Sequence, residues 1–544
     1  MTTTAQTTLD LFPLDVVRDL AVTNGVCVRP VLNRVFDTQT GTDRVVGVSC
    51  GSTLVSKCPP CAAANRRLRM QQCREGWHRD SEPEVPADAD DEPASDDFDA
   101  SRRVRSTRRR QDAADLPKVE MDKRTVGATF TAPNGKTYRP SMFITLTLGS
   151  YGATHRLPHR VEGKGLVPCE CGVIHGQNSP LLSTPVDPDT YNYRRAALDA
   201  LHFPKLIDRF IQNLRRCAGY KAQYFAVVES QKRLAPHLHA AVRGTVARDT
   251  VREVAKATYH QVWWPSHRRP AYGCASSPQL PVWDEMAGAF VDPSTGALLP
   301  TWEQALDDLD ADPAAQPAHV VRFGTQIDYQ GIVADTDAKV GKAIGYLTKY
   351  LGKAIGETYG DDLDELHPAQ RAHINRLHAH VRVLPCSPEC ANWLRHGVTP
   401  KNADGSTTPG ECDSKAHDRA HLGLGGRRVL VSRQWTGKTL TEHRADRSEV
   451  IRQTLAAAGV EMDDQNELAT HTDDPEAPRF IWKPIRPGEE GPRRIPTHKE
   501  VLADAIATRI RWRTQYEQAK QRANPPGAPP GNTNSATDIA ASAA

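Results

Sequence analysis

One segment near the amino terminus limits how this chain can be divided into domains. From Asp80 to Asp99 the sequence contains ten Asp or Glu residues and no Lys or Arg. A segment with so little apolar surface and so much charge of one sign cannot fold by itself. We therefore expect a disordered linker over residues 81–118, acidic first and basic after, which separates an amino-terminal module, residues 1–80, from the rest of the chain.

The composition places the chain among ordinary soluble proteins. Its 544 residues are enough for three to four domains. Because 69 Lys and Arg nearly balance 66 Asp and Glu, the net charge of +3 indicates no particular partner. No apolar run approaches the ~20 residues that span a membrane, and the amino terminus lacks the pattern of a secretory signal. We expect a reducing cytoplasm and no membrane partner, so the 12 cysteines should be thiols or metal ligands.

The first group of cysteines has the spacing of a zinc site. Four thiolates could surround one Zn²⁺ in the amino-terminal module: Cys50, Cys58, Cys61 and Cys73. The C-x-x-C spacing of Cys58 and Cys61 is typical of structural zinc. Two alternatives are unligated thiols and a mixed site that uses His78, Cys169 or Cys171.

A second group predicts another zinc-binding module over residues 361–440. Its four ligands would be Cys386, Cys390, Cys412 and His417. His421 is an alternative to His417. Both ligand sets are closed, so we expect both ions to be structural, with one or two zinc ions per chain.

The same module ends in a short apolar segment, residues 429–431, that basic residues flank. Arg427, Arg428 and Arg433 suggest a strand whose ends contact DNA phosphates. A solvated edge strand with no such role is the alternative. Beyond it we expect a helical C-terminal region over residues 441–522, including a helix over residues 498–522, and a disordered tail over residues 523–544 that is rich in Pro, Gly, Asn and Ser.

The central part of the chain has the pattern of an α+β domain, which we place at residues 119–360. Residues 139–148 alternate between two faces, as in a strand with one buried side. Residues 223–229 and 237–243 predict a hairpin, because a short polar loop joins them. A helix over residues 193–218, with a break at Pro204, should precede it.

The hairpin carries a possible metal site. His237 and His239 are two residues apart, so they lie on one face of a strand. Glu229 precedes His237 by eight residues, and across an antiparallel hairpin the two could lie about 5 Å apart. Two His and one Glu suit a divalent ion that keeps open coordination positions. The alternative is an ordinary strand with two exposed histidines.

A predicted helix over Asp337–Gly356 contains a repeated Tyr-Lys unit. Tyr346 and Tyr350 are four residues apart, hence neighbours on one helix face, and Lys349 and Lys353 follow each by three residues. A nearby cation favours the phenolate, which is the nucleophilic form of tyrosine. A metal ion that polarises a phosphodiester and a tyrosine that attacks it would together nick DNA and form a covalent phosphotyrosine.

Three segments resemble, in order, the motifs of the HUH endonucleases that initiate rolling-circle replication: Phe143-Ile-Thr-Leu-Thr147, Pro236-His-Leu-His239 and Tyr346-Leu-Thr-Lys-Tyr350-Leu-Gly-Lys353. The pair of tyrosines matches the phage-type branch. The segments around Cys386, His417 and Arg433 further resemble the RepSA-type replication initiators of actinobacterial plasmids and integrative elements. The resemblance covers the chain from about residue 25 to residue 447.

This resemblance implies an RRM-like antiparallel sheet that carries the metal ion, Mg²⁺ or Mn²⁺, with the tyrosine helix packed against it. It implies that His237 and His239 are metal ligands and that Tyr346 and Tyr350 are the nucleophiles. Glu229 would be the third ligand. The implied activity is the nicking of one strand at a plasmid origin, which leaves a 5′-phosphotyrosine and a free 3′-hydroxyl for a host polymerase.

Other functions fit part of the same pattern. A two-tyrosine transposase or a relaxase would use the same chemistry at the tyrosine. A zinc-dependent DNA-binding regulator without catalysis belongs to another class and predicts binding without cleavage. No Gly-x4-Gly-Lys-Ser/Thr sequence is present, so we expect a host helicase to unwind the DNA.

Overall fold

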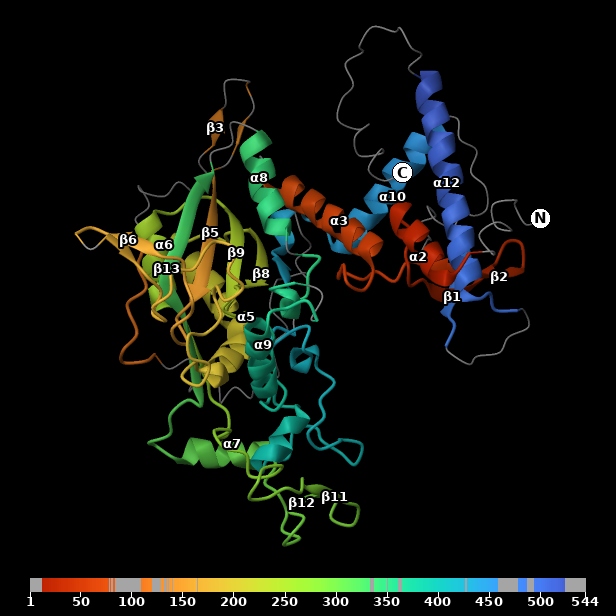
Figure 1. The fold of residues 1–544 in the computed structure, drawn as a ribbon. Coiled ribbons are helices and arrows are strands. Elements are labelled where there is room, and N and C mark those ends of the chain that lie inside the picture. The colour runs from red at the N-terminus through yellow and green to blue at the C-terminus, as the bar shows by residue number, and fades with distance from the viewer. Residues whose placement is uncertain are drawn as a thin grey trace. The chain divides into compact units, whose positions relative to one another are not determined.

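A computed structural model describes most of the chain between residues 12 and 523 (Figure 1). The described residues are 12–77, 79, 82–83, 109–119, 129–131, 135, 137–138, 140–163, 165–332, 337–349, 351–360, 364–425, 428–457, 478–486 and 494–523. They form two compact units. The first unit contains Met1–Cys73, Leu351–Lys353 and Thr436–Ala544, and the second contains Arg74–Tyr350 and Ala354–Trp435. The predicted amino-terminal module and helical C-terminal region therefore fall largely in one unit.

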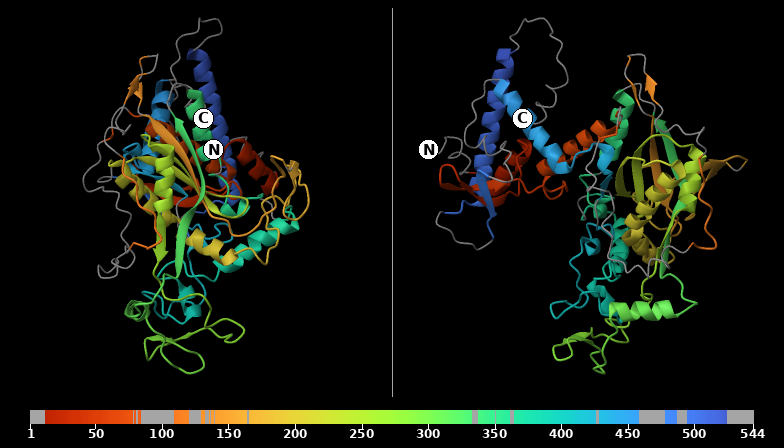
Figure 2. Two further views of the ribbon diagram at one scale, coloured as in Figure 1. Left: turned by 90° about the vertical axis from the view of Figure 1, so that its left-hand side faces the viewer. Right: turned by 180° about the vertical axis from the view of Figure 1, so that it is seen from behind.

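The second unit is built on a six-stranded antiparallel sheet with the strand order β10-β13-β5-β9-β8-β14. Its strands are β5 (Ser141–Leu148), β8 (Tyr224–Ser230), β9 (Pro236–Arg243), β10 (Tyr259–Val262), β13 (His319–Ile332) and β14 (Val429–Val431). The strand predicted over residues 139–148 is confirmed as β5, and the predicted hairpin is confirmed as β8–β9. The sheet and the helix α5, yellow, can be followed from two further sides in Figure 2.

The α-helices of the second unit are α5 (Tyr193–Ala218), α6 (Arg248–Ala257), α7 (Trp302–Ala311), α8 (Asp337–Thr348) and α9 (Pro368–Val381). Short strand pairs complete it: β3 (Phe130–Thr131) with β4 (Thr137–Tyr138), β6 (His159–Val161) with β7 (Gly165–Val167), and β11 (Val282–Asp284) with β12 (Ala289–Val291). The described residues of this unit also include the 3₁₀ turns η3 (Ile355–Glu357), η4 (Ala391–His396), η5 (Lys415–His417) and η6 (Arg433–Trp435).

The two faces of β5 have different roles. The even-numbered apolar residues of this strand join the main core with the apolar side of α5: Met142, Ile144, Leu146 and Leu148 from the strand, and Phe203, Leu206, Phe210 and Leu214 from the helix. Because side chains alternate along a strand, Thr145 and Thr147 lie on the opposite face. They pair directly with His239 and His237, so this second face carries the candidate site.

The helix α5 runs through Pro204 without the predicted break. Proline inside a helix removes one hydrogen bond and costs about 3 kcal/mol. Here Phe203 and Leu206, on either side of Pro204, are fully buried in the core. Their packing against the sheet outweighs the lost hydrogen bond.

The first unit contains a three-stranded antiparallel sheet in the order β15-β1-β2. Its strands and helices are α2 (Leu14–Thr23), β1 (Val31–Asp37), β2 (Thr42–Val48), the first part of α3 (Pro59–Trp77), α10 (Leu440–Ala457), β15 (Phe480–Pro484) and α12 (His498–Ala523). The helix α12 confirms the predicted C-terminal helix. Its Leu502 and Ile506 form a small core with Val17, Ala21 and Val26.

The end of the predicted linker belongs to the second unit. The backbone of Arg110 donates a hydrogen bond to the Tyr259 hydroxyl at 3.0 Å, and Asp112 pairs with Arg322 at 2.7 Å. Leu116 and Val119 pack against the main core. Residues 109–118 are therefore ordered, contrary to the prediction, because these side chains have partners on the sheet. Most of the remaining linker, and the tail beyond residue 523, lie outside the described residues. Among the described helices, none is long and apolar enough to cross a membrane.

Three buried histidines make the second unit sensitive to acid. Burial lowers the pKa of His267 and of His373 to about 4, and that of His202 well below its ordinary value of 6.5. Between about pH 6.5 and pH 4 each of these three histidines therefore binds a proton in the unfolded chain but not in the folded chain. At ~1.4 kcal/mol per pH unit and proton, these three groups should together lower the free energy of unfolding by about 5 kcal/mol between pH 6.5 and pH 5. Urea unfolding at the two pH values measures this loss.

A single variant checks the origin of this acid sensitivity. His373→Gln keeps a partner for the Tyr193 hydroxyl, which lies 2.8 Å from the imidazole Nδ1 atom. In the variant the free energy of unfolding should fall by about 1.5 kcal/mol less between pH 6.5 and pH 5, because one titrating group has been removed. An unchanged pH dependence would show that His373 is not one of its sources.

Candidate active site

The β8–β9 hairpin brings three possible metal ligands together. Glu229 pairs directly with His237 across the hairpin, as the sequence predicts. The Glu229 Oε2 atom lies 3.6 Å from His239 Nε2 and 3.9 Å from His237 Nε2. The two Nε2 atoms are 2.7 Å apart. All three ligand atoms thus point toward one position.

The turn between the two strands is anchored to β5. The Arg233 guanidinium donates hydrogen bonds to the carbonyl oxygens of Leu148 and Gly149, at 2.7 and 2.8 Å. At the other end of the site, the Thr145 hydroxyl lies 2.9 Å from His239 Nδ1. This contact leaves Nε2 of the same ring to face the other ligands, as in many metal sites.

Burial sets the charge of the three residues. It lowers the pKa of His239 to about 4 and that of His237 to about 3, with further lowering of the latter by His239 and Arg233. Both imidazoles are therefore neutral at pH 7, which is the form that binds a metal. Burial also raises the pKa of Glu229 to about 7, against the opposing charges of Arg428 and Lys349.

The donor set fits a divalent cation. Two polar atoms of the group, Glu229 Oε1 and His237 Nδ1, are buried without a hydrogen-bond partner among the described residues. An ion at the centre would compensate the buried carboxylate. Three protein ligands leave coordination positions open for a substrate oxygen.

Tyr346 lies beside this group. It belongs to α8, and its ring centre is 4.9 Å from that of His239 and 6.0 Å from that of Phe143, edge-on in both cases. Phe143 in turn stacks on His239 at 5.9 Å. Tyr346 is 47% exposed, so a substrate can reach it. The motif tyrosine and the histidine pair are therefore neighbours in space, although more than 100 positions separate them in the sequence.

The helix that carries Tyr346 is shorter than the sequence predicts. It ends at Thr348 and not at Gly356. The Lys349 backbone already bonds to the Tyr346 carbonyl with i→i−3 spacing, a tightening typical of helix ends. Gly352, a residue of low helix propensity, follows shortly after.

The other residues of the predicted Tyr-Lys repeat have different positions. Lys349 is exposed, and its charge acts on Glu229. Lys353 is also exposed but belongs to the first unit. Tyr350 lies outside the described residues.

The predicted basic strand is the edge strand β14. Arg428, just before it, is half-buried, and its Nε donates to the Val228 carbonyl at 3.3 Å. Its charge lowers the pKa of Glu229, so Arg428 lies near the candidate site. Arg433 is exposed in η6, and Arg427 lies outside the described residues.

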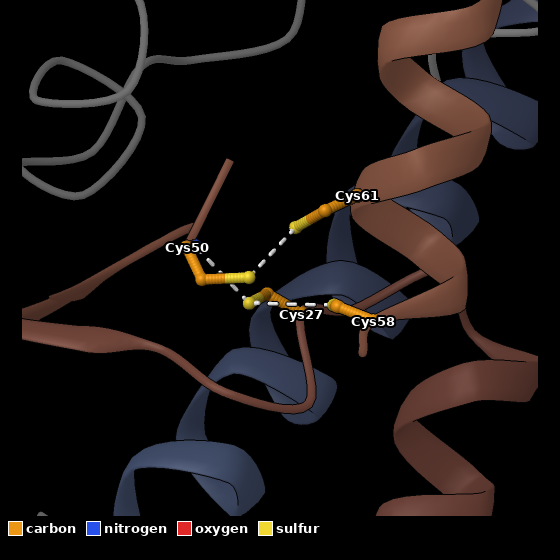
Figure 3. A group of neighbouring side chains, drawn as sticks. All are labelled: Cys27, Cys50, Cys58 and Cys61. Atoms are coloured by element: carbon orange, nitrogen blue, oxygen red, sulfur yellow. Dashed lines mark hydrogen bonds between the residues drawn. The ribbon is translucent and has the colours of Figure 1, made fainter. Parts of the chain in front are cut away.

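Four cysteines of the first unit converge, but they are not the four that the sequence suggests (Figure 3). They are Cys27, Cys50, Cys58 and Cys61. The sulfur of Cys50 lies 3.7 Å from that of Cys61, and the sulfur of Cys58 lies 3.8 Å from that of Cys27. Tetrahedral zinc with Zn–S bonds of about 2.3 Å places sulfurs about 3.8 Å apart. The group therefore has the dimensions of a Cys₄ zinc site.

Cys73 is not part of this group. It lies on α3, and 12 residues of helix after Cys61 correspond to about 18 Å along the axis. Cys27 takes the fourth position because β1 and β2, which follow it, form a hairpin that returns the chain to Cys50. Cys27 and Cys50 are 23 residues apart, so the spacing of the cysteines did not indicate that they belong to one site.

The ligands of the second predicted group lie together as expected. The histidine of this group is His417 and not the alternative His421. Cys386 and Cys412 lie 3.9 Å apart, and Cys390 lies 3.4 Å from His417 Nε2. His417 Nδ1 is 2.8 Å from the Val381 carbonyl oxygen, which directs Nε2 toward the sulfurs. The set Cys386, Cys390, Cys412 and His417 is consistent with structural zinc.

Comparison with known proteins defines the class. The family described as "RepSA: Replication initiator protein, pSAM2" matches residues 13–508. The chain therefore belongs to the RepSA family of plasmid replication initiators, which confirms the resemblance seen in its motifs.

A relative shares part of the chain. It is a replication initiator protein from Streptomyces ambofaciens, 28% identical over an alignment of 337 residues that covers 54% of this chain. The match spans 65% of the relative, less than two thirds of its length. No solved structure matches the chain.

Proposed function

We propose that this replication initiator nicks one strand of its origin by tyrosine attack on a phosphodiester. The observation that carries the proposal is the position of Tyr346, half-exposed beside His239 in a group of three convergent ligands. Membership in the RepSA family favours initiation of replication over transposition or conjugation.

The chemistry requires three contributions from the chain. His237, His239 and Glu229 would hold Mg²⁺ or Mn²⁺, which supplies positive charge to the phosphate when bound. Tyr346 lies where its hydroxyl can approach that phosphate. Lys349, close enough to lower the pKa of Glu229, adds a positive charge that favours the phenolate.

The reaction exchanges one ester for another. The phenol gives up its proton, its oxygen bonds to phosphorus, and the bond from phosphorus to the 3′ oxygen breaks. The 3′ oxygen takes up a proton and becomes the primer for a host polymerase. The 5′-phosphotyrosine preserves the ester, so a later hydroxyl can reverse the step without ATP.

Tyr350 is the second nucleophile in this proposal. After one round of replication it attacks the regenerated origin, and the first phosphotyrosine is resolved by the released 3′-hydroxyl. Lys353 would favour the phenolate form of Tyr350, as Lys349 would favour that of Tyr346. A host helicase unwinds the cytoplasmic plasmid, and Arg427, Arg428 and Arg433 contact the origin DNA.

Metal-dependent cleavage tests the function. We would incubate the purified chain with Mn²⁺ and labelled single-stranded oligonucleotides that tile both strands of the DNA flanking its gene. We expect cleavage at one position of one strand, and none when EDTA is present. Binding of the duplex without cleavage of any oligonucleotide would favour a DNA-binding regulator instead.

A further inference from the structure

A third group of cysteines and histidines lies in the loop between β5 and α5. It consists of His155, Cys169, Cys171 and His175, whose ligand atoms all lie within 4.8 Å of one another. The sequence suggests Cys169 and Cys171 only as alternatives for the amino-terminal site. In the structure they belong to the second unit and have two histidines of their own.

The spacing of the four ligand atoms matches tetrahedral zinc. Cys171 Sγ lies 3.2 Å from His175 Nε2, Cys169 Sγ lies 3.7 Å from His155 Nδ1, and the two nitrogens are 3.2 Å apart. Zn–S bonds of about 2.3 Å and Zn–N bonds of about 2.0 Å give separations of about 3.3 to 3.8 Å in a tetrahedron. The two candidate zinc groups described above have similar spacings, between 3.4 and 3.9 Å.

The backbone around the cysteines forms a tight turn. Gly172 donates to the Cys169 carbonyl at 2.8 Å, and Cys169 donates to the Val173 carbonyl at 3.1 Å. Gly172 has φ of 82°, a conformation that glycine adopts without strain. This turn aims both sulfurs at one point.

The two histidines come from either side of this turn. The backbone of His155 exchanges hydrogen bonds with Ser183 and Thr184, each at 2.8 Å. His175 Nδ1 is 3.5 Å from the Ser179 hydroxyl, on the side of the ring away from the sulfurs. His155, the turn with the two cysteines, and His175 thus meet at the ligand group.

The loop buries few apolar side chains between Tyr151 and Tyr191. Its regular structure is the β6–β7 pair, whose residues are nearly all exposed. Val173 and Ile174, between Cys171 and His175, are 53% and 60% exposed. Segments that lack a core of their own commonly depend on a bound metal. Cys169 and Cys171 are both free cysteines, so a disulfide does not account for the cluster.

We propose that His155, Cys169, Cys171 and His175 bind a third structural Zn²⁺ that fixes this loop. The loop is attached to the active-site hairpin at its ends. Tyr151 and Tyr191 pack edge-on at 5.9 Å, and the Tyr191 hydroxyl donates to the Arg233 carbonyl at 2.6 Å. Arg233 lies in the turn that precedes His237, so the ion supports the hairpin from outside the nicking site.

Counting zinc tests the proposal without reference to nicking. Elemental mass spectrometry of the purified proteins should find one more zinc ion per chain in the wild type than in the double variant Cys169→Ser, Cys171→Ser. The matched control Cys274→Ser, at a half-exposed thiol outside all metal groups of the described residues, should keep the wild-type value. Equal zinc content in the wild type and the double variant would overturn the proposal.

A second measurement uses the unmodified chain, in case the double variant fails to fold. We would alkylate the purified protein with iodoacetamide and follow each cysteine by peptide mass spectrometry. Cys171 is partly exposed, as is Cys274, but zinc should slow its alkylation at least tenfold relative to Cys274 until a chelator is added. If Cys171 reacts as fast as Cys274 before chelation, no ion is bound there.

Discussion

Replacing His239 by Gln should reduce metal-dependent nicking about a thousandfold. The imidazole Nε2 atom of His239 lies 3.6 Å from the Glu229 carboxylate, in the group that would hold the ion. Loss of the ion removes several kcal/mol of stabilisation from the charged transition state, and ~4 kcal/mol corresponds to a factor of about 10³. Single-turnover cleavage of the origin oligonucleotide measures the rate, and Mn²⁺ titration measures binding independently.

A milder variant distinguishes the effect of losing the ligand from the effect of losing the residue that orients it. Thr145→Val removes the hydroxyl that lies 2.9 Å from His239 Nδ1 but leaves the ligands in place. Such a loss typically weakens metal binding about 10- to 100-fold. Excess Mn²⁺ should therefore restore nicking by Thr145→Val and not by His239→Gln.

The control for both variants is His159→Gln, at an exposed histidine of β6, which should behave as the wild type. Circular dichroism should show that all three variants remain folded. Wild-type cleavage by a folded His239→Gln variant would contradict the assignment of this residue as a ligand.

Replacing Cys27 by Ser should release one zinc ion and unfold the region around the first cluster. The described core of the first unit is small, since α2 and α12 contribute only a few fully buried side chains. Structural zinc binding contributes about 10–16 kcal/mol in small zinc-dependent domains, so little would remain to hold this unit without it. Zinc content per chain and the rate of limited proteolysis between residues 27 and 61 measure the two effects.

Cys73→Ser is the matched control, because Cys73 is a fully buried cysteine of the same unit outside the cluster. It should keep the wild-type zinc content and lose about 1–3 kcal/mol of stability at most. Loss of zinc from Cys73→Ser, with Cys27→Ser unaffected, would favour the ligand set that the spacing of the cysteines alone suggests.

The hairpin at the active site could be predicted because its information is local. The alternation around His237 and the short turn after Glu229 determine both the register and the shared face. The Cys₃His group was predictable for a similar reason, since one short module holds all its ligands.

The missed features depend on tertiary structure. Cys27 joins its cluster only after β1 and β2 pair, and His155 joins Cys169 only after the intervening loop folds back. Pro204 remains inside α5 because the core on both sides of it is buried. The helix α8 ends early for a mainly local reason, which is the turn at Lys349 followed by Gly352. The sequence did not indicate this end, because the helical spacing of apolar residues continues beyond Thr348.

Covalent attachment of DNA is the most direct test of the proposed nickase. The wild-type chain, the double variant Tyr346→Phe, Tyr350→Phe and the control Tyr272→Phe would be incubated with the cleaved oligonucleotide and Mn²⁺, then separated on a denaturing gel and digested for peptide mass spectrometry. The wild type and the control should carry a nucleotide on the peptide that contains residues 346–350, and the double variant should carry none. A covalent adduct that persists in the double variant, or one on another peptide, would contradict the account.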